Sequence, residues 1–127
     1  MDKVKSLKIG VLGEDIAEKF LKNKGFAIIC RNYRKKWGEI DIVCEISGIT
    51  HFVEVKSVSQ GTFQQFTDEF RPEDNLNHNK AVRLRRVIET YMEENHVEND
   101  FVCDLITVRI NEKTKEARVV FWEDLIF

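Results

Sequence analysis

The sequence is poor in the residues and segments that mark several large classes of protein. Its 127 residues include three cysteines, one proline and six glycines, which excludes collagen-like and low-complexity chains. Cys30, Cys44 and Cys103 lie far apart and form no Cys-x-x-Cys pair, so neither a zinc ribbon nor a disulfide framework is expected. No apolar run approaches the roughly 18 residues of a membrane-spanning helix, and no secretory signal is visible. We therefore expect a reduced, cytoplasmic protein with no membrane partner.

What the sequence does contain is enough apolar and charged residues for one folded domain. Hydrophobic residues make up 43% of the chain and charged residues 33%, so residues 1–127 are expected to form a single domain with a real core. The net charge of −2 is unevenly spread. Residues 1–36 hold ten Lys and Arg against four Asp and Glu, a net +6 that leaves −8 for the rest. A second basic cluster comprises Lys80, Arg83, Arg85 and Arg86. Such clusters either follow a phosphate backbone or are solvated helix faces.

The hydrophobic spacing predicts an α/β fold. Helical spacing marks residues 6–24, with Ser6 as a plausible N-cap and Gly25 as a C-terminal stop, and it marks a second helix over residues 81–92. Strand-like runs cover residues 26–33, 37–46, 50–58, 101–110 and 117–122. The polar stretch 59–79 is long for a structureless connection. The order α-β-β-β-α-β-β predicts a mixed β-sheet flanked by helices.

The central hairpin carries an unusual arrangement of charges. If Ser47 and Gly48 form a two-residue turn, the two positions in each cross-strand pair add up to 95, and Asp41 lies opposite Glu54. The other expected pairs are Glu39 with Lys56 on the same charged face, and Ile40 with Val55 and Ile42 with Val53 on the apolar face. A slip of one residue would bury the charges, which favours this register.

Two opposed carboxylates need an explanation. Directly opposed residues have Cβ atoms about 4.5–5.5 Å apart, so Asp41 and Glu54 would repel each other unless something positive lay between them. Mg²⁺ prefers oxygen ligands and is a natural occupant; Lys56, on the same face, could contact a water bound to the metal. The alternative is an ordinary sheet surface, on which Glu39 pairs with Lys56 and Asp41 is solvated.

Two residues of the helices are candidates for the same place. Glu14 flanks the apolar stripe of the first helix, so it either leans toward the sheet or is an ordinary exposed side chain. Lys80 falls inside the apolar stripe of the second helix and in its first turn, where a positive charge opposes the helix dipole. A site anion or a carboxylate partner would explain Lys80, and so would a stem that is buried while its amine reaches solvent.

Taken together, several segments resemble a known family. They are Gly10-Val11-Leu12-Gly13-Glu14-Asp15-Ile16-Ala17, Arg31-Asn32-Tyr33-Arg34, Gly38-Glu39-Ile40-Asp41, Phe52-Val53-Glu54-Val55-Lys56, Lys80 in a helix, and Cys103-Asp104-Leu105. In order and spacing they resemble the YraN family, an uncharacterised bacterial family placed in the restriction-endonuclease-like, PD-(D/E)XK nuclease superfamily. The resemblance implies one nuclease-like domain over residues 1–127, with a restriction-endonuclease-like mixed sheet flanked by α-helices.

The resemblance also implies roles for particular residues. Asp41 matches the metal-binding Asp of the superfamily, and Glu54 and Lys56 match its acidic-x-Lys element. The implied metal ligands, for Mg²⁺ or Mn²⁺, are Glu14, Asp41, Glu54 and the Val55 carbonyl, and the implied catalytic residues are Asp41, Glu54, Lys56 and Glu39. In this scheme Lys56 orients the attacking water, and Glu39 positions Lys56 or extends the metal shell.

The implied activity is that of a metal-dependent endonuclease that hydrolyses phosphodiester bonds in DNA. Branched or single-stranded DNA is a candidate substrate, as for the Holliday-junction resolvases of this superfamily. Junction resolution would favour a homodimer, because two symmetric cuts need two sites. The residues expected to hold the phosphate backbone are Arg31, Arg34, Lys35, Lys36, Lys80 and Arg83. The alternatives are a catalytically inactive nucleic-acid-binding module and a protein-interaction module on the same fold.

The sequence departs from the pattern in three places. Ile40 stands where the superfamily has proline before the Asp, Val58 stands where the family often has a basic residue, and the stretch from Lys56 to Lys80 is longer than usual. The added residues include Phe63, Phe66, Phe70 and Arg71, which would shape a substrate channel or a dimer contact. Asp104 matches a family position, where it either supports the site or ends a strand ladder.

Overall fold

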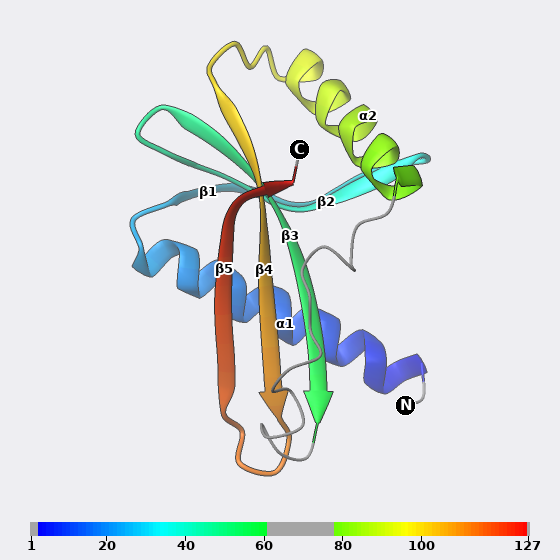
Figure 1. Cartoon of the computed structure of the whole chain (residues 1–127), viewed down its shortest axis with the longest axis vertical. Helices are drawn as coiled ribbons and strands as arrows, with labels where there is room; N and C mark the ends of the chain where they lie inside the picture. The colour runs from blue at the N-terminus through cyan, green and yellow to red at the C-terminus, as the bar shows by residue number, and fades with distance from the viewer. Residues whose placement is uncertain (1–2, 61–77, 127) are drawn as a thin grey trace.

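Seven helices and strands follow one another in the order predicted from the sequence (Figure 1). The computed structural model describes residues 3–60 and 78–126. The elements are α1 (Lys3–Asn23), β1 (Ala27–Lys35), β2 (Gly38–Ile46), β3 (Ile49–Gln60), α2 (His78–Glu94), β4 (Phe101–Asn111) and β5 (Ala117–Ile126). The strands form one sheet in the order β1-β2-β3-β4-β5; β3 and β4 are parallel and the other neighbours antiparallel. The prediction of an α/β protein with a mixed sheet is confirmed.

The end of α1 is the predicted one, and its beginning is not. Gly25 has a φ of 98° and donates to the Lys22 carbonyl, while Phe26 donates to the Leu21 carbonyl, both at 3.0 Å. This pair of bonds is a Schellman motif, in which glycine accepts the left-handed conformation without strain. Ser6 is not the N-cap, because the helix already begins at Lys3 and nothing in residues 3–5 breaks it.

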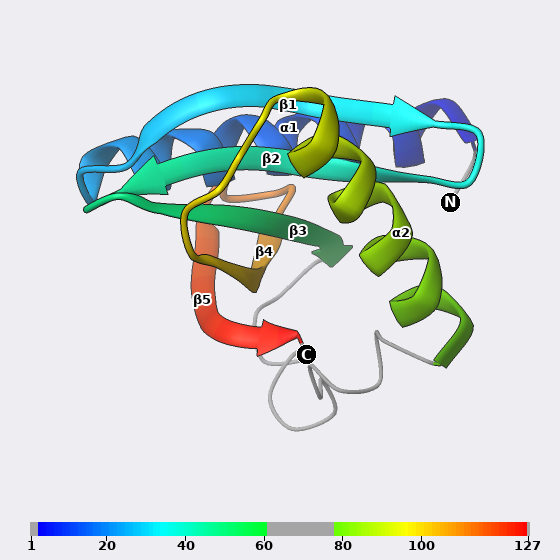
Figure 2. The same ribbon diagram turned by 90° about the horizontal axis from the view of Figure 1, so that it is seen from above.

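Each face of the sheet is covered by one helix. The core on the α1 side contains Ile9, Ala17, Leu21, Phe26, Ile42, Cys44, Val53, Ile106, Val108 and Ile110. The core on the α2 side contains Ile40, Val43, Phe52, Leu84, Val87, Ile88, Tyr91 and Cys103. The sheet twists strongly between the two helices, so that β1 and β2 run across the direction of β4 and β5 (Figure 2).

The predicted register of the central hairpin is confirmed over half of its length. Ser47 and Gly48 have φ values of 52° and 76°, as a two-residue turn between twisted strands requires. Pairing then runs from Ile46 with Ile49 to Ile42 with Val53. Beyond that point β2 turns away from β3 (Figure 1). The expected ladder pairs Asp41 with Glu54, Ile40 with Val55, and Glu39 with Lys56 do not form.

The pleat of β2 is interrupted at Asp41. Ile42 packs on the α1 side of the sheet and Ile40 on the α2 side, although residues two apart share a face in a regular strand. In β1, Asn32 stands opposite this point and has a left-handed φ of 55°. The expectation that Ile40 and Ile42 share one apolar face is therefore wrong, because both strands change faces here.

Two predictions concern other parts of the chain. In the part that the structure describes, no helix is long and apolar enough to cross a membrane. Residues 61–77, which include Phe63, Phe66, Phe70 and Arg71, lie outside the described residues, so the expected channel or dimer contact stays a prediction.

Candidate active site

The separation of β2 from β3 creates the candidate site. A strand residue that loses its neighbouring strand needs another acceptor for its backbone N–H. The Asp41 side chain is that acceptor for Val55. Its Oδ2 accepts the Val55 N–H at 2.8 Å, and the Asp41 side chain is only 8% exposed. The N–H and C=O of one strand residue point to the same side, so the Val55 carbonyl faces the same gap. Asp41 thus caps the point of divergence with a buried carboxylate.

A pocket of about 390 Å³ opens at this gap. Its lining residues come from α1, β2, β3 and α2: Glu14, Gly38, Glu39, Asp41, Glu54, Val55, Lys80, Arg83 and Leu84. Seven of these are residues that the sequence assigned to a metal, catalytic or phosphate-binding role. Four are acidic, and two are basic residues of α2. Segments from four elements therefore meet at one acidic pocket with a basic side.

Burial and mutual repulsion make the two central carboxyls hard to ionise. Burial raises the pKa of Glu54 to about 8, and the charge of Asp41 adds to this. Burial also raises the pKa of Asp41 to about 6, with contributions from Glu14 and Glu39, although the Val55 N–H lowers it. A positive charge at this place would remove the repulsion between the carboxylates.

Lys80 supplies part of that positive charge. It lines the pocket, and its charge lowers the pKa of both Asp41 and Glu54. It stands in the first turn of α2, which has no acidic residue. Of the three explanations left open for Lys80, the carboxylate partner therefore fits the structure.

The position of Glu14 depends on Gly13, which belongs to the first matching segment but received no role from the sequence. A Cβ on Gly13 would lie 1.6 Å from the Ser57 Oγ and 2.7 Å from its Cβ. Only glycine lets α1 approach β3 this closely, and the approach brings the next residue, Glu14, to the pocket. An interior glycine in a helical pattern often has a packing reason, and this was the available signal.

Arg31, one of the residues expected to bind a phosphate backbone, is paired with the carboxylates of α1. Its guanidinium lies 3.3 Å from Glu14, 2.7 Å from Asp15 and 3.6 Å from Glu18, and the side chain is only 23% exposed. Across residues 3–60 and 78–126, no group of three or more His, Cys, Asp or Glu forms an arrangement that could hold a metal ion. Glu14 reaches the pocket with its carboxylate paired to Arg31.

The other predicted basic residues divide into paired and unpaired ones. Arg34 binds Glu39 at 2.9 and 3.0 Å, and Lys35 binds Glu94 at 2.9 Å. Lys36 and Arg83 make no ion pair within the described ranges.

Lys56 is placed differently from the other predicted catalytic residues. Alternation along β3 puts it on the same face as Glu54, yet it is not among the described residues that line the pocket. Glu39, expected to position Lys56 or to extend the metal shell, lines the pocket and also binds Arg34. The structure thus brings together Asp41, Glu54 and Glu14 and leaves Lys56 beside them.

The donor set fits a divalent metal ion such as Mg²⁺ or Mn²⁺. The Oε1 atom of Glu54 is buried and has no hydrogen-bond partner in the described part of the chain, although buried carboxylate oxygens are normally satisfied. Mg²⁺ commonly binds through one or two carboxylates and keeps several waters. Asp41, Glu54 and the Val55 carbonyl could supply such ligands, and Glu14 would join them by leaving Arg31.

A second carboxylate cluster is structural. Asp104 is fully buried; it lies 2.6 Å from the Nδ1 of His51 and accepts the Asp124 N–H at 2.7 Å. None of these residues lines the acidic pocket. Asp104 therefore connects β3, β4 and β5. Of the two roles expected for it, this arrangement fits the end of a strand ladder better than support of the site.

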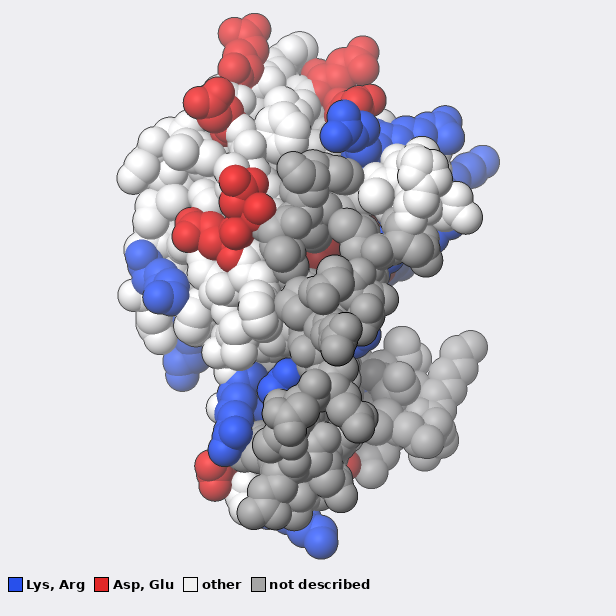
Figure 3. All heavy atoms as spheres, in the orientation of Figure 1, with Lys and Arg blue, Asp and Glu red and all other residues white. Residues whose placement is uncertain are grey.

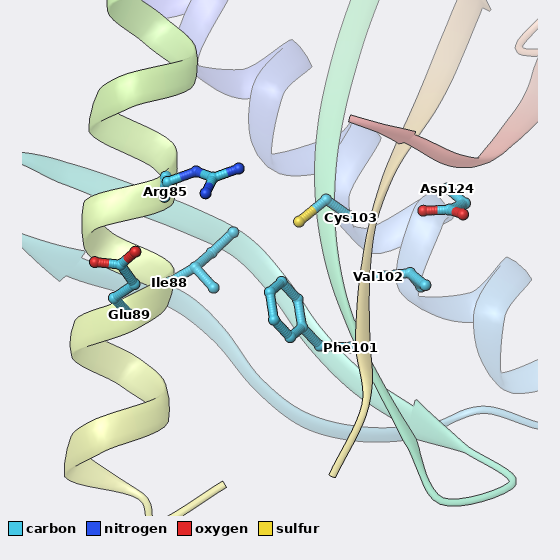
Figure 4. Close-up of a pocket in the computed structure, with 7 residues that line it drawn as sticks. All are labelled: Arg85, Ile88, Glu89, Phe101, Val102, Cys103 and Asp124. Carbon is cyan, nitrogen blue, oxygen red and sulfur yellow. The ribbon is translucent and has the colours of Figure 1, made fainter. Parts of the chain in front are cut away.

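A smaller hollow of about 200 Å³ lies between α2 and β4, as Figure 4 shows. Arg85 points into it from α2, with Ile88 beside it, while Phe101 and Cys103 approach from β4 (Figure 4). Burial raises the pKa of the Cys103 thiol to about 12, so this cysteine is no nucleophile near neutral pH.

The fold and the pocket define an α/β protein with an acidic site where two strands of a mixed sheet diverge. The profile of the family described as uncharacterised protein family UPF0102, also known as the YraN family, matches residues 13–109. A UPF0102 protein of Campylobacter jejuni is 40% identical over 106 residues, which cover 84% of this chain and 88% of the relative. One from Alkaliphilus oremlandii is 38% identical over 109 residues, with the same shares covered. The chain belongs to the UPF0102 family.

Proposed function

We propose that this UPF0102 protein is a metal-dependent nuclease that hydrolyses phosphodiester bonds in DNA. The observation that carries the proposal is the pair of buried carboxyls, Asp41 and Glu54, which share one pocket, both have a raised pKa and are partly offset by the charge of Lys80. Holding two such groups together costs folding free energy, which a purely structural sheet surface would not need. A site for a hard cation and a phosphodiester is the simplest use of them.

The chain's own residues divide the work around the phosphodiester. Asp41, Glu54 and the Val55 carbonyl, joined by Glu14, would hold Mg²⁺ or Mn²⁺. When bound, the metal would neutralise charge on the phosphoryl oxygens and lower the pKa of a water. Lys56 would orient the attacking water or stabilise the developing charge. The whole domain, residues 1–127, would then serve this one site.

Two cations of α2 would place the substrate. Lys80 and Arg83 line the same pocket as the carboxylates, where they would hold phosphate oxygens without reading the base sequence. Arg31, Arg34 and Lys35 are expected to share this role, and each also pairs with carboxylates of the chain. Lys36, two residues before Gly38 of the pocket lining, keeps the expected role. Backbone contacts of this kind give binding that weakens steeply with salt.

The proposal is tested by cleavage of labelled single-stranded, duplex and four-way branched DNA in Mg²⁺ or Mn²⁺. Asp41→Asn keeps an acceptor for the Val55 N–H, so it should fold and lose at least about 100-fold in rate, by analogy with loss of other charge-stabilising groups. Asp100→Asn, at an exposed position, controls for loss of one charge. A closed circular substrate separates endonuclease from exonuclease action.

Each alternative outcome has a definite meaning. Full activity of a folded Asp41→Asn protein would refute the site. Binding of DNA by the wild type without cleavage would support a catalytically inactive binding module. Absence of both metal and DNA binding would favour a protein-interaction module. Sedimentation of the protein with and without a DNA junction would test the homodimer.

A further inference from the structure

A tryptophan and an arginine are stacked beside the acidic pocket. Trp37 stands in the turn between β1 and β2, and the guanidinium carbon of Arg86, on α2, lies 4.4 Å from its ring centroid. A planar guanidinium stacked on an aromatic ring is held in one orientation. Its edge can then donate several hydrogen bonds to a single anion.

The surroundings of this pair favour a role toward a ligand. The indole N–H of Trp37 is buried and finds no acceptor among the described residues, so its polar group does not explain the position of the ring. Arg86 is exposed and makes no ion pair with any described carboxylate, whereas Arg31, Arg34 and Lys35 all do. Arg86 is therefore an oriented cation with no carboxylate partner in the part of the chain that the structure describes.

The pair adjoins the proposed site through both of its residues. Trp37 precedes Gly38, and Arg86 lies one helical turn after Arg83; Gly38 and Arg83 both line the pocket. A Cβ on Gly38 would lie 3.4 Å from the Arg83 carbonyl oxygen, at ordinary van der Waals distance, so α2 packs directly against the start of β2. Three residues advance a helix by about 4.5 Å. Figure 3 shows Lys and Arg side chains gathered over α2 where it meets this turn.

We propose that Arg86, held in place by Trp37, binds a phosphate of the DNA strand next to the one held in the pocket. This inference rests on the proposed function and adds a contact outside the pocket. A strand that brings one phosphate to the carboxylates continues past them, and its next phosphate needs a cation. Lys80 and Arg83 serve the first phosphate, and Arg86 is the next cation along the same helix. The ligand is a backbone phosphodiester of DNA, not a base.

The test compares four variants in DNA binding over a range of salt concentrations. Fluorescence polarisation is measured with a labelled 20-nucleotide single strand and the matching duplex, in Ca²⁺ as an oxygen-preferring substitute for Mg²⁺, with DNA integrity checked on a gel. Arg86→Ala removes the contact, and Arg86→Lys and Trp37→Leu keep a charge at position 86 without the stack. Arg85→Ala is the matched control, because this neighbour points into the other hollow (Figure 4).

The expected effect follows from release of counterions. One phosphate contact contributes about 0.9 to the slope of log affinity against log salt on duplex DNA and about 0.7 on a single strand. Arg86→Ala should lower the slope by that amount. Between about 1 M and 0.1 M salt the variant should therefore fall behind the wild type in affinity by about eightfold on duplex DNA and about fivefold on a single strand. Arg86→Lys and Trp37→Leu should weaken binding by about two- to threefold with little change in slope, because the charge stays but its orientation is lost.

The outcomes separate this inference from the proposed function. Arg86→Ala should leave the melting temperature and the Mn²⁺ affinity unchanged, so a loss of DNA binding alone supports the phosphate contact. If Arg86→Ala binds like the wild type, or if Arg85→Ala loses as much, the contact is refuted and the nuclease proposal stands. If the wild type neither binds nor cleaves DNA, both are refuted. Should Trp37→Leu fail to fold, Arg86→Lys still decides whether orientation matters.

Discussion

Replacement of Glu54 by glutamine should make the metal-free protein more stable at alkaline pH. The Glu54 carboxyl has its pKa raised from the usual 4.5 to about 8 by burial and by the charge of Asp41. A carboxyl with a raised pKa in the folded state binds more protons there than in the unfolded chain. The contribution of the protonated Glu54 carboxyl to the free energy of unfolding is therefore fully present below about pH 4.5 and is lost as the pH rises toward 8. Glutamine has nearly the same shape and no charge, so it removes this loss.

The magnitude follows from the size of the pKa change. One pKa unit corresponds to about 1.4 kcal/mol, so ionised Glu54 costs several kcal/mol at pH 9, with an upper bound of about 5 kcal/mol. The advantage of Glu54→Gln should be near zero at pH 4.5 and should grow up to about pH 8. A divalent metal should reverse the order at pH 8, because it stabilises only the protein that keeps both carboxylates.

Urea unfolding in EDTA at pH 5, 7 and 9 measures this directly. Glu93→Gln, at an exposed position of α2, serves as the control and should show little change at any pH. The reasoning would be refuted if Glu54→Gln were no more stable than the wild type at pH 9. An equal gain at pH 5 and pH 9 would also refute it, because loss of a titrating charge cannot act equally at both.

Two further predictions concern the framework around the site. Gly13→Ala should destabilise the protein by about 1–3 kcal/mol, because its Cβ would overlap Ser57. Gly10→Ala, whose Cβ would have nothing within 4 Å, should instead stabilise it by up to about 1 kcal/mol through helix propensity. Equal effects of the two substitutions in thermal unfolding would contradict this. Asp104→Ala should cost about 3–5 kcal/mol, because it leaves His51 and a backbone N–H without their buried partner. The Mn²⁺ affinity of its folded protein should equal that of the wild type, and a calorimetric loss of Mn²⁺ binding would instead connect Asp104 to the site.

Much of the fold could be predicted because its turns and helix ends depend on residues that are close together in the sequence. The Ser47 and Gly48 turn and the apolar alternation specified the register between Ile42 and Val53 without any tertiary information. The stop at Gly25 is likewise local, since a Schellman motif needs only a residue that accepts positive φ.

The details of the site could not be predicted in the same way. The register assumed a regular ladder to the end of the hairpin, but the twisted sheet separates β2 from β3 at Asp41. The change of face at Asp41 coincides with the positive φ of Asn32, which stands opposite it in the paired strand β1. The sequence of β2 alone contains no pattern that reveals this change. The pairing of Arg31 with Glu14 joins residues from two elements, so a charge count over residues 1–36 does not reveal which cations are already paired with carboxylates of the chain.

Titration calorimetry of Mn²⁺ into the wild type and Asp41→Asn tests the central claim most directly. The account predicts a binding isotherm for the wild type and none for the variant, whose fold is checked by circular dichroism. The same protein concentration and a pH near 7.5 should be used for both, because ligand carboxyls must lose their protons to bind metal. No isotherm for the wild type, with or without a short DNA, or an unchanged isotherm for Asp41→Asn, would contradict the claim that these carboxylates form a metal site.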